Sequence, residues 1–487
     1  MGLVPLLSLL VVVTHMLLVA AIALRVIMKR PATGVALAWL LLVVSLPFAG
    51  AVIYLLIGER RVSRTRASRL EVVRGNLRSI AREALREGLT DVDWSRLPSV
   101  AHGIDHLGRA TAGSPTVQGS SFELIPDTET VLRRIAQDVE HAQSSVLMEF
   151  YIWNAGGLAD EVLAALVRAA QRGVSCRALI DAVGARPWWK GPQPGQLRAA
   201  GVDVRQALPV GLFRAFVGRT DLRMHRKIVV IDGNVAWTGS MNLVDPRFFK
   251  QDAGVGQWVD AMVRLRGAVV AALTATLVGD WALETGESIE ELIEDVDLRL
   301  VASQGPADIQ VIPSGPGETD DSLLQMLLAL INAARRELVL TTPYLVPDES
   351  LLRALRGAAG RGVDVILVLP EKVDSFLTRH ASRSYYADLL DVGVELCLYR
   401  TGLLHTKSIT VDREMSMFGT VNLDMRSLWL NYEVALFVYD RGFARELRAL
   451  QQRYIEDADR IDARAWTHRS FGPRLLENTL RLMSPAL

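Results

Sequence analysis

An internal repeat constrains the fold of this chain more than any other feature of its sequence. Residues 225–232 read HRKIVVID and residues 405–412 read HTKSITVD, so each copy has the pattern H-x-K-x4-D. The run between the lysine and the aspartate is rich in β-branched residues, which predicts a buried strand. Residues two apart on a strand share one face, so the histidine and lysine of each copy are expected to point at the same target.

The repeat extends beyond these two strands. Residues 145–153 match 337–346, each an apolar strand with a tyrosine, and a helix and a further strand follow in both copies. Strand–helix–strand alternation predicts an α/β fold with a largely parallel sheet. We therefore expect two pseudo-symmetric α/β lobes, 122–300 and 301–487, packed face to face around one shared active site, because a single lobe would hold only half of the repeated residues.

The scarcity of lysine in this chain indicates that the two motif lysines have a specific role. Lysine occurs only six times among the 54 basic residues, and two of the six stand two residues after a histidine. Acidic and basic residues balance to a net charge of zero, which argues against a nucleic-acid partner. Cys176 and Cys397 lie in apolar runs and are expected to be core thiols, without a disulfide or a metal cluster.

The segments that flank the motifs resemble those of a known protein family. Residues 238–247 (TGSMNLVDPR), 251–258 (QDAGVGQW) and 419–427 (GTVNLDMRS) resemble the bacterial cardiolipin synthases of the phospholipase D superfamily, whose signature is the duplicated H-x-K-x4-D. The resemblance covers nearly the whole chain. It implies transfer of a phosphatidyl group between two phosphatidylglycerol molecules, giving cardiolipin and glycerol through a phosphatidyl-histidine.

The resemblance also assigns roles to the repeated residues. Phosphodiester exchange needs an in-line nucleophile, a proton donor for the leaving alcohol and positive charge on the phosphate oxygens. By resemblance, His225 is the nucleophile and His405 the general acid and base, although the pseudo-symmetry also allows the reverse. The groups expected to hold the phosphate oxygens are Lys227, Lys407, Asn242 and Asn422, with Ser240 and Thr420 as weaker candidates.

Two acids lie in apolar, strand-like runs downstream of the motifs. A carboxylate in such a run needs a polar partner, and a catalytic histidine needs an acceptor that fixes its tautomer. We therefore expect Asp260 to orient His225 and Glu433 to orient His405, with surface positions for the two acids as the alternative.

The aspartates that end the motifs, Asp232 and Asp412, are expected to close the turn after each strand and so to support the catalytic set structurally. The later Arg247 and Arg426 are expected to hold either a loop or a headgroup phosphate. The scheme requires no cofactor and no metal. The sequence contains neither a phosphate-binding G-x4-G-K-[ST] loop nor a complete dinucleotide fingerprint.

The N-terminal region is typical of a membrane segment. Residues 3–24 are almost continuously apolar, and a helix of this length would reach roughly 33 Å, enough to cross a bilayer. A second apolar run at 35–57 argues against a cleaved signal peptide. We expect a two-helix membrane hairpin over residues 1–58, in which Pro47 kinks the second helix, and a shallow hairpin that does not fully span the bilayer is the alternative.

Basic residues suggest the orientation. Residues 25–30 contain three of them, and a denser cluster follows at 60–69. By the positive-inside rule, the denser cluster predicts cytoplasmic catalytic lobes. The resemblance to the bacterial family, together with the hairpin, implies a multi-pass protein of the inner membrane. Residues 59–121 are expected to form a basic helical segment followed by a linker at 108–121.

Other stretches combine aromatic with basic residues, which suits a membrane interface. These stretches are 188–190, 212–219 and 248–250, and an ordinary covering loop is the alternative for each. The C-terminal segment 466–487 alternates arginine with apolar residues and is expected to dock either on lipid or on the lobes.

Two other functions share part of this pattern. A membrane-bound hydrolase of the same superfamily would release phosphatidic acid, and only the acceptor alcohol would differ. A catalytically silent lipid-binding scaffold would not need both lysines, and a nuclease is disfavoured by the apolar hairpin. The sequence leaves the oligomeric state open.

Overall fold

The computed structural model describes residues 3–31, 33–58, 64–211, 219, 221–296, 301, 303–317 and 321–483. The chain divides into two compact units. The first contains Met1–Arg64 with Val210–Asp221, and the second contains Thr65–Pro209 with Leu222–Leu487.

The first unit contains three helices, α1 (Leu3–Lys29), α2 (Thr33–Ser45) and α3 (Ala49–Ile57). Helix α1 is apolar throughout and, within the described residues, it alone is long enough to cross a membrane. Ile22 and Val26 of α1 pack with Val43, Ala51 and Tyr54 of the other two helices.

The second apolar run departs from the predicted hairpin. It breaks between α2 and α3 at Pro47 and Phe48, where Phe48 adopts a φ of 59°. Proline has no N–H to continue the helix ladder, so the break falls where the kink was expected. Helix α2, with 13 residues, is about 20 Å long, which is too short for a bilayer of about 30 Å. The described structure therefore does not support a second spanning helix.

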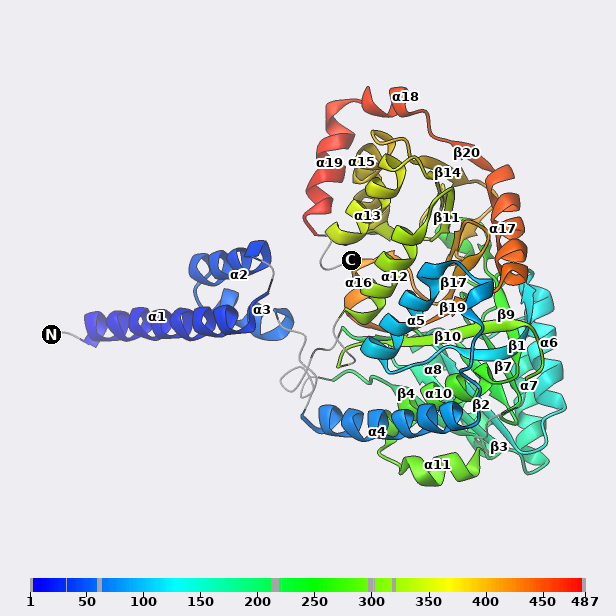
Figure 1. Ribbon diagram of the computed structural model, residues 1–487. Coiled ribbons are helices and arrows are strands. Elements are labelled where there is room, and N and C mark those ends of the chain that lie inside the picture. The colour runs from blue at the N-terminus through cyan, green and yellow to red at the C-terminus, as the bar shows by residue number, and fades with distance from the viewer. Residues whose placement is uncertain are drawn as a thin grey trace. The chain divides into compact units, whose positions relative to one another are not determined.

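The second unit is an α/β fold built from two similar halves (Figure 1). The first half contains β1 (Val117–Ile125), α6 (Thr128–Glu140), β2 (Ser145–Phe150), α7 (Leu158–Gln171), β3 (Ser175–Asp181), α8 (Arg186–Trp189), α9 (Gln193–Ala199), β4 (Asp203–Ala207), β5 (Arg223–Met224), β6 (Ile228–Ile231), β7 (Val235–Gly239), β8 (Trp258–Val259), β9 (Met262–Arg266), α10 (Val269–Thr285) and α11 (Ile289–Asp295).

The second half repeats this order and adds elements at its end. It contains β10 (Ala307–Ser314), α12 (Ser322–Ala333), β11 (Glu337–Thr341), β12 (Leu345–Val346), α13 (Glu349–Gly360), β13 (Asp364–Pro370), α14 (Phe376–Ser384), α15 (Tyr386–Leu390), β14 (Glu395–Tyr399), β15 (Leu403–Leu404), β16 (Ser408–Val411), β17 (Met415–Gly419), β18 (Leu423–Asp424), α16 (Met425–Trp429), β19 (Asn431–Val438), α17 (Arg441–Glu456), β20 (Ala458–Arg460), α18 (Ala463–Thr467) and α19 (Phe471–Arg481).

The two halves form one 16-stranded sheet whose order is palindromic: β20-β14-β13-β11-β16-β17-β19-β10-β1-β9-β7-β6-β2-β3-β4, with β5 on β19. The halves meet edge to edge, because β1 and β10 pair in antiparallel fashion at Val117↔Ile309 and Ser120↔Ala307. The predicted face-to-face packing is therefore wrong. Pairing the two edges satisfies backbone groups that separate lobes would leave exposed.

The sheet is also less parallel than predicted. Strands β2, β3 and β4 run parallel, as do their counterparts β11, β13 and β14. The strands β6, β7 and β9 are antiparallel neighbours. A short turn joins β6 to β7, and a short connection can only link antiparallel strands.

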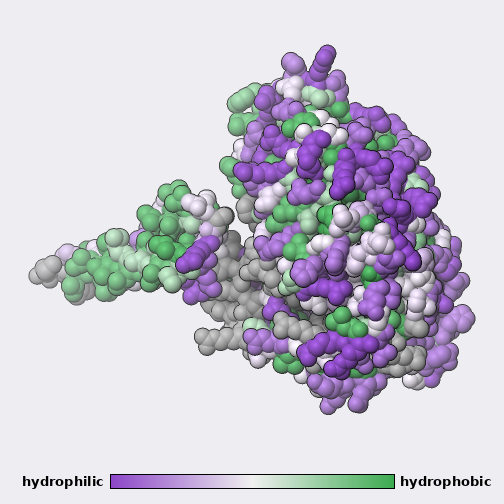
Figure 2. All heavy atoms as spheres, in the orientation of Figure 1, coloured by the Kyte–Doolittle hydropathy of each residue, from purple (hydrophilic) through white to green (hydrophobic). Residues whose placement is uncertain are grey.

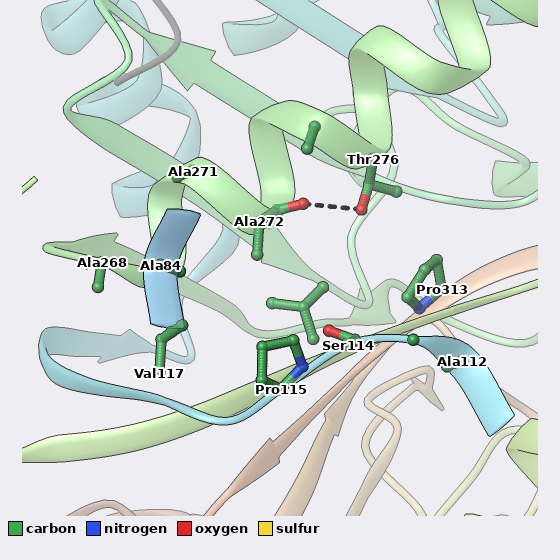
Figure 3. A pocket seen from close by; sticks show the side chains of 13 residues that line it. Ala84, Ala112, Ser114, Pro115, Val117, Ala268, Ala271, Ala272, Thr276 and Pro313 are labelled. Atoms are coloured by element: carbon green, nitrogen blue, oxygen red, sulfur yellow. Dashed lines mark hydrogen bonds between the residues drawn. The ribbon is translucent and has the colours of Figure 1, made fainter. Parts of the chain in front are cut away.

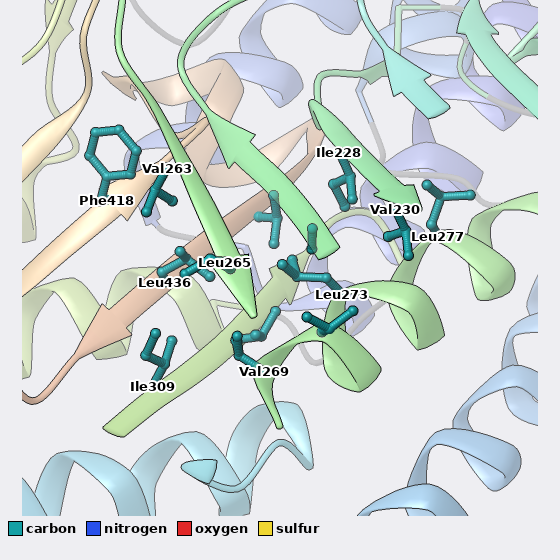
Figure 4. Close-up of a cluster of buried hydrophobic side chains, with 14 of the residues drawn as sticks. Ile228, Val230, Val263, Leu265, Val269, Leu273, Leu277, Ile309, Phe418 and Leu436 are labelled. Atoms are coloured by element: carbon teal, nitrogen blue, oxygen red, sulfur yellow. The ribbon is translucent and has the colours of Figure 1, made fainter. Parts of the chain in front are cut away.

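Helices cover both faces of the sheet. In β6, Ile228 and Val230 belong to the same core as α10, whereas Val229 and Ile231 belong to the core shared with α6 and α7. The first of these cores continues into the second half, where Ile309, Phe418 and Leu436 join it (Figure 4). Both motif strands thus lie inside one rigid, continuously packed unit.

The segment before β1 is more ordered than the predicted linker. Helix α4 (Arg64–Arg86) buries Leu70 and Val73 and forms a salt bridge between Arg66 and Glu284 of α10. Helix α5 (Ser99–Ala112) packs on α12 and β10, and β1 already begins at Val117. The linker predicted at 108–121 therefore shortens to the few residues between α5 and β1.

A small cavity lies between α4, α10 and β10 (Figure 3). It is lined by Ala84, Ala112, Gly113, Ser114, Pro115, Val117, Ala268, Ala271, Ala272, Ala275, Thr276, Val311 and Pro313. None of these residues is titratable, so this cavity does not carry the predicted chemistry.

Candidate active site

The backbone segment that leads into each motif histidine lies against the opposite half. Strand β5 pairs with β19, and the His225 amide donates to the Tyr432 carbonyl at 2.9 Å. In the same way β15 pairs with β8, and the His405 amide donates to the Val259 carbonyl at 2.8 Å. Both histidines are therefore fixed at the junction of the two halves by backbone hydrogen bonds.

This crossing decides which acid orients which histidine. His225 Nδ1 lies 2.9 Å from Glu433 Oε2, and His405 Nδ1 lies 2.7 Å from Asp260 Oδ1. The predicted pairs, His225 with Asp260 and His405 with Glu433, are wrong. Asp260 directly follows β8 and Glu433 lies within β19. Each of these strands pairs with the segment before the other half's histidine, so the facing carboxylate comes from across the junction.

The charges of these pairs follow from burial and contact. Burial lowers the pKa of His225 and of His405 to about 4, although the facing carboxylates oppose the shift. Burial raises the pKa of Glu433 and Asp260, but the facing imidazoles and hydrogen bonds outweigh it, and both values end below the ordinary range. Each pair thus consists of a carboxylate and a neutral imidazole with its proton on Nδ1, which leaves Nε2 as the nucleophilic nitrogen.

The hydroxyl groups expected at the phosphate contact the acids instead. Ser240 Oγ donates to Asp260 Oδ1 at 2.6 Å, and Thr420 Oγ1 donates to Glu433 Oε2 at 2.6 Å. Because a hydroxyl has one proton to donate, these residues are positioned to hold the carboxylates rather than a substrate oxygen.

The two motif lysines are fully buried beside the histidines. Lys227 Nζ donates to the His225 carbonyl at 2.6 Å, and Lys407 Nζ donates to the His405 carbonyl at 2.5 Å. Burial lowers the pKa of Lys227 to about 8 and that of Lys407 to about 7. An ammonium has three hydrogens, so each lysine retains donors for an anionic oxygen.

The two asparagines are buried near the histidines but differ in their contacts. Asn242 Oδ1 accepts a hydrogen bond from the Ile152 amide at 3.1 Å. Asn422 is 4% exposed, and its Oδ1 lacks a hydrogen-bond partner within the described part of the chain. A buried carbonyl oxygen without a partner is costly, and a group that donates a hydrogen bond, such as a substrate hydroxyl, would satisfy it.

The motif aspartates lie at the far ends of their strands. Asp232 accepts hydrogen bonds from the backbone amides of Gln143, Ser144 and Ser145. Asp412 accepts them from the amides of residues 335–337. Both have positive φ, 52° and 54°, a conformation that aspartate tolerates better than most residues. Their contacts support the structural role expected for them.

Aromatic side chains line the histidines. The Tyr151 ring lies 5.0 Å from the His225 ring in an edge-on arrangement, and the Trp258 ring lies 4.3 Å from that of His405. Beside them, Asp374 accepts a hydrogen bond from Tyr344 and forms a 2.8 Å salt bridge with Lys250. Asp374 could not be predicted from the repeat, because it lies in the loop before α14, outside the repeated motifs.

A buried ion pair beneath His225 was also missed. Arg226 forms an ion pair with Asp280 and donates to the Glu433 carbonyl at 2.9 Å. Glu149 is completely buried nearby, and burial followed by the charge of Asp280 raises its pKa well above the ordinary value. A glutamate in the apolar strand at 145–150 was the available signal. This cluster fixes the backbone that carries Glu433.

Three further expectations have different outcomes. Trp188 is buried and stacks on Trp153 at 4.7 Å, so its predicted place at a membrane interface is wrong. The stretch 212–219 lies outside the described residues except for Arg219. Arg247 forms salt bridges with Asp245 and Glu129, so it holds its loop.

A known family model matches each of the two halves separately. The family model described as "Cardiolipin synthase, PLD-like domain" matches residues 135–260 and 327–455, and each segment contains one H-x-K motif. A second model, "Phospholipase_D-nuclease N-terminal", matches residues 17–59.

Similar sequences span the full length. Cardiolipin synthase A of Serratia proteamaculans is 42% identical over 481 residues, covering 99% of this chain and 98% of the relative. Cardiolipin synthase A of Erwinia tasmaniensis is 43% identical over 486 residues with the same coverage. The crystal structure of phosphatidylserine synthase from Haemophilus influenzae has a TM-score of 0.60 and 12% identity, covering 79% of this chain and 100% of that one. This last likeness concerns the fold alone.

Proposed function

The chain belongs to the cardiolipin synthase family of phospholipase D-like phosphatidyltransferases, and from this premise we propose that it converts two phosphatidylglycerol molecules into cardiolipin and glycerol. The observation that carries the proposal is the crossed pairing of His225 with Glu433 and of His405 with Asp260. Neither half holds a complete histidine–carboxylate pair, so the two halves act as one site.

In the proposed first step, His225 Nε2 attacks the phosphorus of one phosphatidylglycerol. The bond from phosphorus to the glycerol oxygen breaks, and protonated His405 gives its proton to that oxygen. Glu433 stabilises the positive charge that develops on the His225 ring. His405 is neutral in the empty site, and the charge of the bound phosphodiester favours its protonation.

In the second step, His405 takes a proton from the glycerol hydroxyl of a second phosphatidylglycerol. The resulting oxygen attacks phosphorus, the bond from phosphorus to His225 breaks, and cardiolipin leaves. One phosphodiester replaces another, so the exchange needs no external energy source. The pseudo-symmetry of the site leaves the reverse assignment of the two histidines as an outcome for experiment.

The phosphate is proposed to lie between the two lysines. Lys227 and Lys407 flank the histidines from opposite halves, and each retains ammonium donors. Asn242 and Asn422 complete the set, because the amide nitrogen of each carboxamide can donate a hydrogen bond to a phosphate oxygen. Fixed donors around the non-bridging oxygens would stabilise the charge of the transition state.

The apolar α1 and the family relationship indicate a membrane protein. We further propose that α1 crosses the inner membrane of a bacterium once and that α2 and α3 do not cross it. Under this arrangement the basic residues at 25–30 and those at 60–69 lie on the same side. Both clusters then satisfy the positive-inside rule with the catalytic unit in the cytoplasm.

Product analysis tests the proposed reaction. Purified full-length protein in phosphatidylglycerol vesicles, without nucleotide, should give cardiolipin and glycerol in equal amounts, and added glycerol should reverse the reaction. Phosphatidic acid as the main product would favour the hydrolase. A requirement for a cytidine-linked lipid would overturn the mechanism.

A further inference from the structure

Helix α19 exposes apolar side chains to solvent and buries its acidic side chain, the reverse of what is usual for a surface helix. Its acid, Glu477, is buried and binds Arg383 and Arg469 at 2.9 Å. Most of its apolar side chains point outward: Phe471 is 76% exposed and Leu475 is 54% exposed, whereas Leu480 is buried. Leu482, which directly follows the helix, is 81% exposed. Figure 2 shows hydrophobic side chains gathered where α19 runs. A surface helix that is this apolar indicates a partner.

The exposed apolar surface continues onto neighbouring segments. Helix α14 packs beside α19 and begins with Phe376 and Leu377, which are 61% and 38% exposed. Just before α14, Asp374 binds Lys250, and two residues before Lys250 stands Phe248, which is 56% exposed. We call this set the α14/α19 surface; it contains Phe248, Phe376, Leu377, Phe471, Leu475, Leu476, Leu482 and Met483.

The α14/α19 surface adjoins the active site. The Lys250 ammonium lies 5.4 Å from the centre of the Trp258 ring, and that ring lies 4.3 Å from the ring of His405. Tyr344 donates to Asp374 on the other side of the salt bridge. Aromatic contacts therefore connect the apolar surface to the histidine that handles the proton.

The charges around this surface select its partner. Within residues 374–384 and 469–483 there are five arginines and two acids, Asp374 and Glu477. Arg383 and Arg469 pair with Glu477, and Arg481 pairs with Asp388 just outside this range. The remaining positive charge of the surface is therefore carried by Arg379 and Arg474. A second copy of the same surface would meet like charge, whereas a bilayer with anionic lipid supplies both apolar depth and negative charge.

We infer that the α14/α19 surface inserts shallowly into the membrane and holds the mouth of the active site, on its His405 side, against the lipid. The docking itself is independent of the reaction, and only its effect on turnover rests on the proposed function. Phosphatidylglycerol would then reach His405 without leaving the bilayer interface, and water would be kept from the intermediate.

Depth-dependent quenching tests the docking in the full chain. The native Cys176 and Cys397 are buried, so a fluorophore can be attached to Leu475→Cys and, as a control on α7, to Glu161→Cys. In phosphatidylglycerol vesicles with nitroxide-labelled lipid, the probe at 475 should be quenched about tenfold more than at 161. Equal quenching overturns the inference, as would cross-links between copies at 475 without quenching.

A kinetic test separates docking from catalysis. The double substitution Leu475→Glu with Leu482→Glu should lower kcat/KM on vesicles about tenfold and leave the rate in detergent micelles within about twofold. Gln171→Glu with Gln206→Glu adds the same charge elsewhere and should change neither rate. Equal losses in vesicles and micelles overturn the inference. If the wild type makes no cardiolipin, the proposed function fails while the quenching result still decides the docking.

Discussion

Substitution of Glu433 by glutamine tests the crossed site most directly. Glu433 is fully buried and accepts hydrogen bonds from His225 and Thr420 at 2.9 and 2.6 Å. Glutamine has the same shape and can still accept the Nδ1 proton, but it removes the charge that faces the imidazole. Burial already disfavours a charged His225, with a pKa of about 4, so the positive ring of the intermediate would lose its counter-charge.

The size of the effect follows from the loss of a charge that orients and stabilises a catalytic histidine. Comparable losses reduce turnover on the order of 10²- to 10⁴-fold, equivalent to about 3 to 5 kcal/mol in the barrier. We expect Glu433→Gln to slow formation of the adduct on His225. Asp260→Asn should slow breakdown of the adduct as well as its formation, because the impaired His405 must protonate the leaving glycerol and then deprotonate the acceptor.

Single-turnover reactions with phosphate-labelled phosphatidylglycerol measure both steps. Mass spectrometry identifies the labelled histidine, and thermal unfolding shows whether the variants are folded. Glu349→Gln, at an exposed position on α13, should behave like the wild type. An adduct that accumulates in Glu433→Gln and not in Asp260→Asn would refute the assignment. Adduct formation within about threefold of the wild-type rate would refute the role of the crossed pairing.

Four further outcomes are expected. The kcat/KM should fall as pH rises through about 7, because Lys407, whose pKa burial lowers to about 7, loses the charge that binds phosphate; a profile that stays flat to high pH contradicts this. Stability should decrease as pH falls from about 6.5 towards 4, since the unfolded chain protonates His225 and His405 before the folded protein does; thermal unfolding measures it, and a midpoint that rises with acid would count against it. Asp232→Asn keeps the left-handed backbone but weakens three hydrogen bonds from backbone amides, so the free energy of unfolding should fall by about 2 to 3 kcal/mol. Denaturant titration measures this change, and an unchanged midpoint would contradict it. Trp188→Ala should cost about 3 to 5 kcal/mol by the same titration, because the ring is buried in the core; a loss below about 1 kcal/mol would mean that the ring is not packed as described.

The sequence by itself determined the repeated unit and its chemical groups. Histidine and lysine two apart on an apolar strand must share a face, and this depends only on strand geometry. The alternation of β2, α7 and β3 is written in local hydrophobic periodicity, so the α/β class and the repeat could be predicted. The acids at 260 and 433 were also found locally, because a carboxylate within an apolar strand needs a buried partner.

Only the tertiary structure decided which partner each acid has. Asp260 and Glu433 follow their own motifs at similar distances along the chain. This spacing does not show whether each acid faces the histidine of its own half or that of the other half. The choice depends on β5 joining β19 and β15 joining β8, which are backbone contacts between distant segments.

Contacts between distant segments also explain the other differences between the predicted and the observed structure. Whether the halves meet by edges or by faces depends on β1 and β10 pairing across nearly 200 residues of chain, roughly the separation of the two motifs. Composition could mark the Trp188 stretch and the C-terminal segment as aromatic or amphipathic. It could not show that Trp188 packs inward onto Trp153 while α19 exposes Leu475 and Leu476, because that orientation is set by the surfaces against which each element packs.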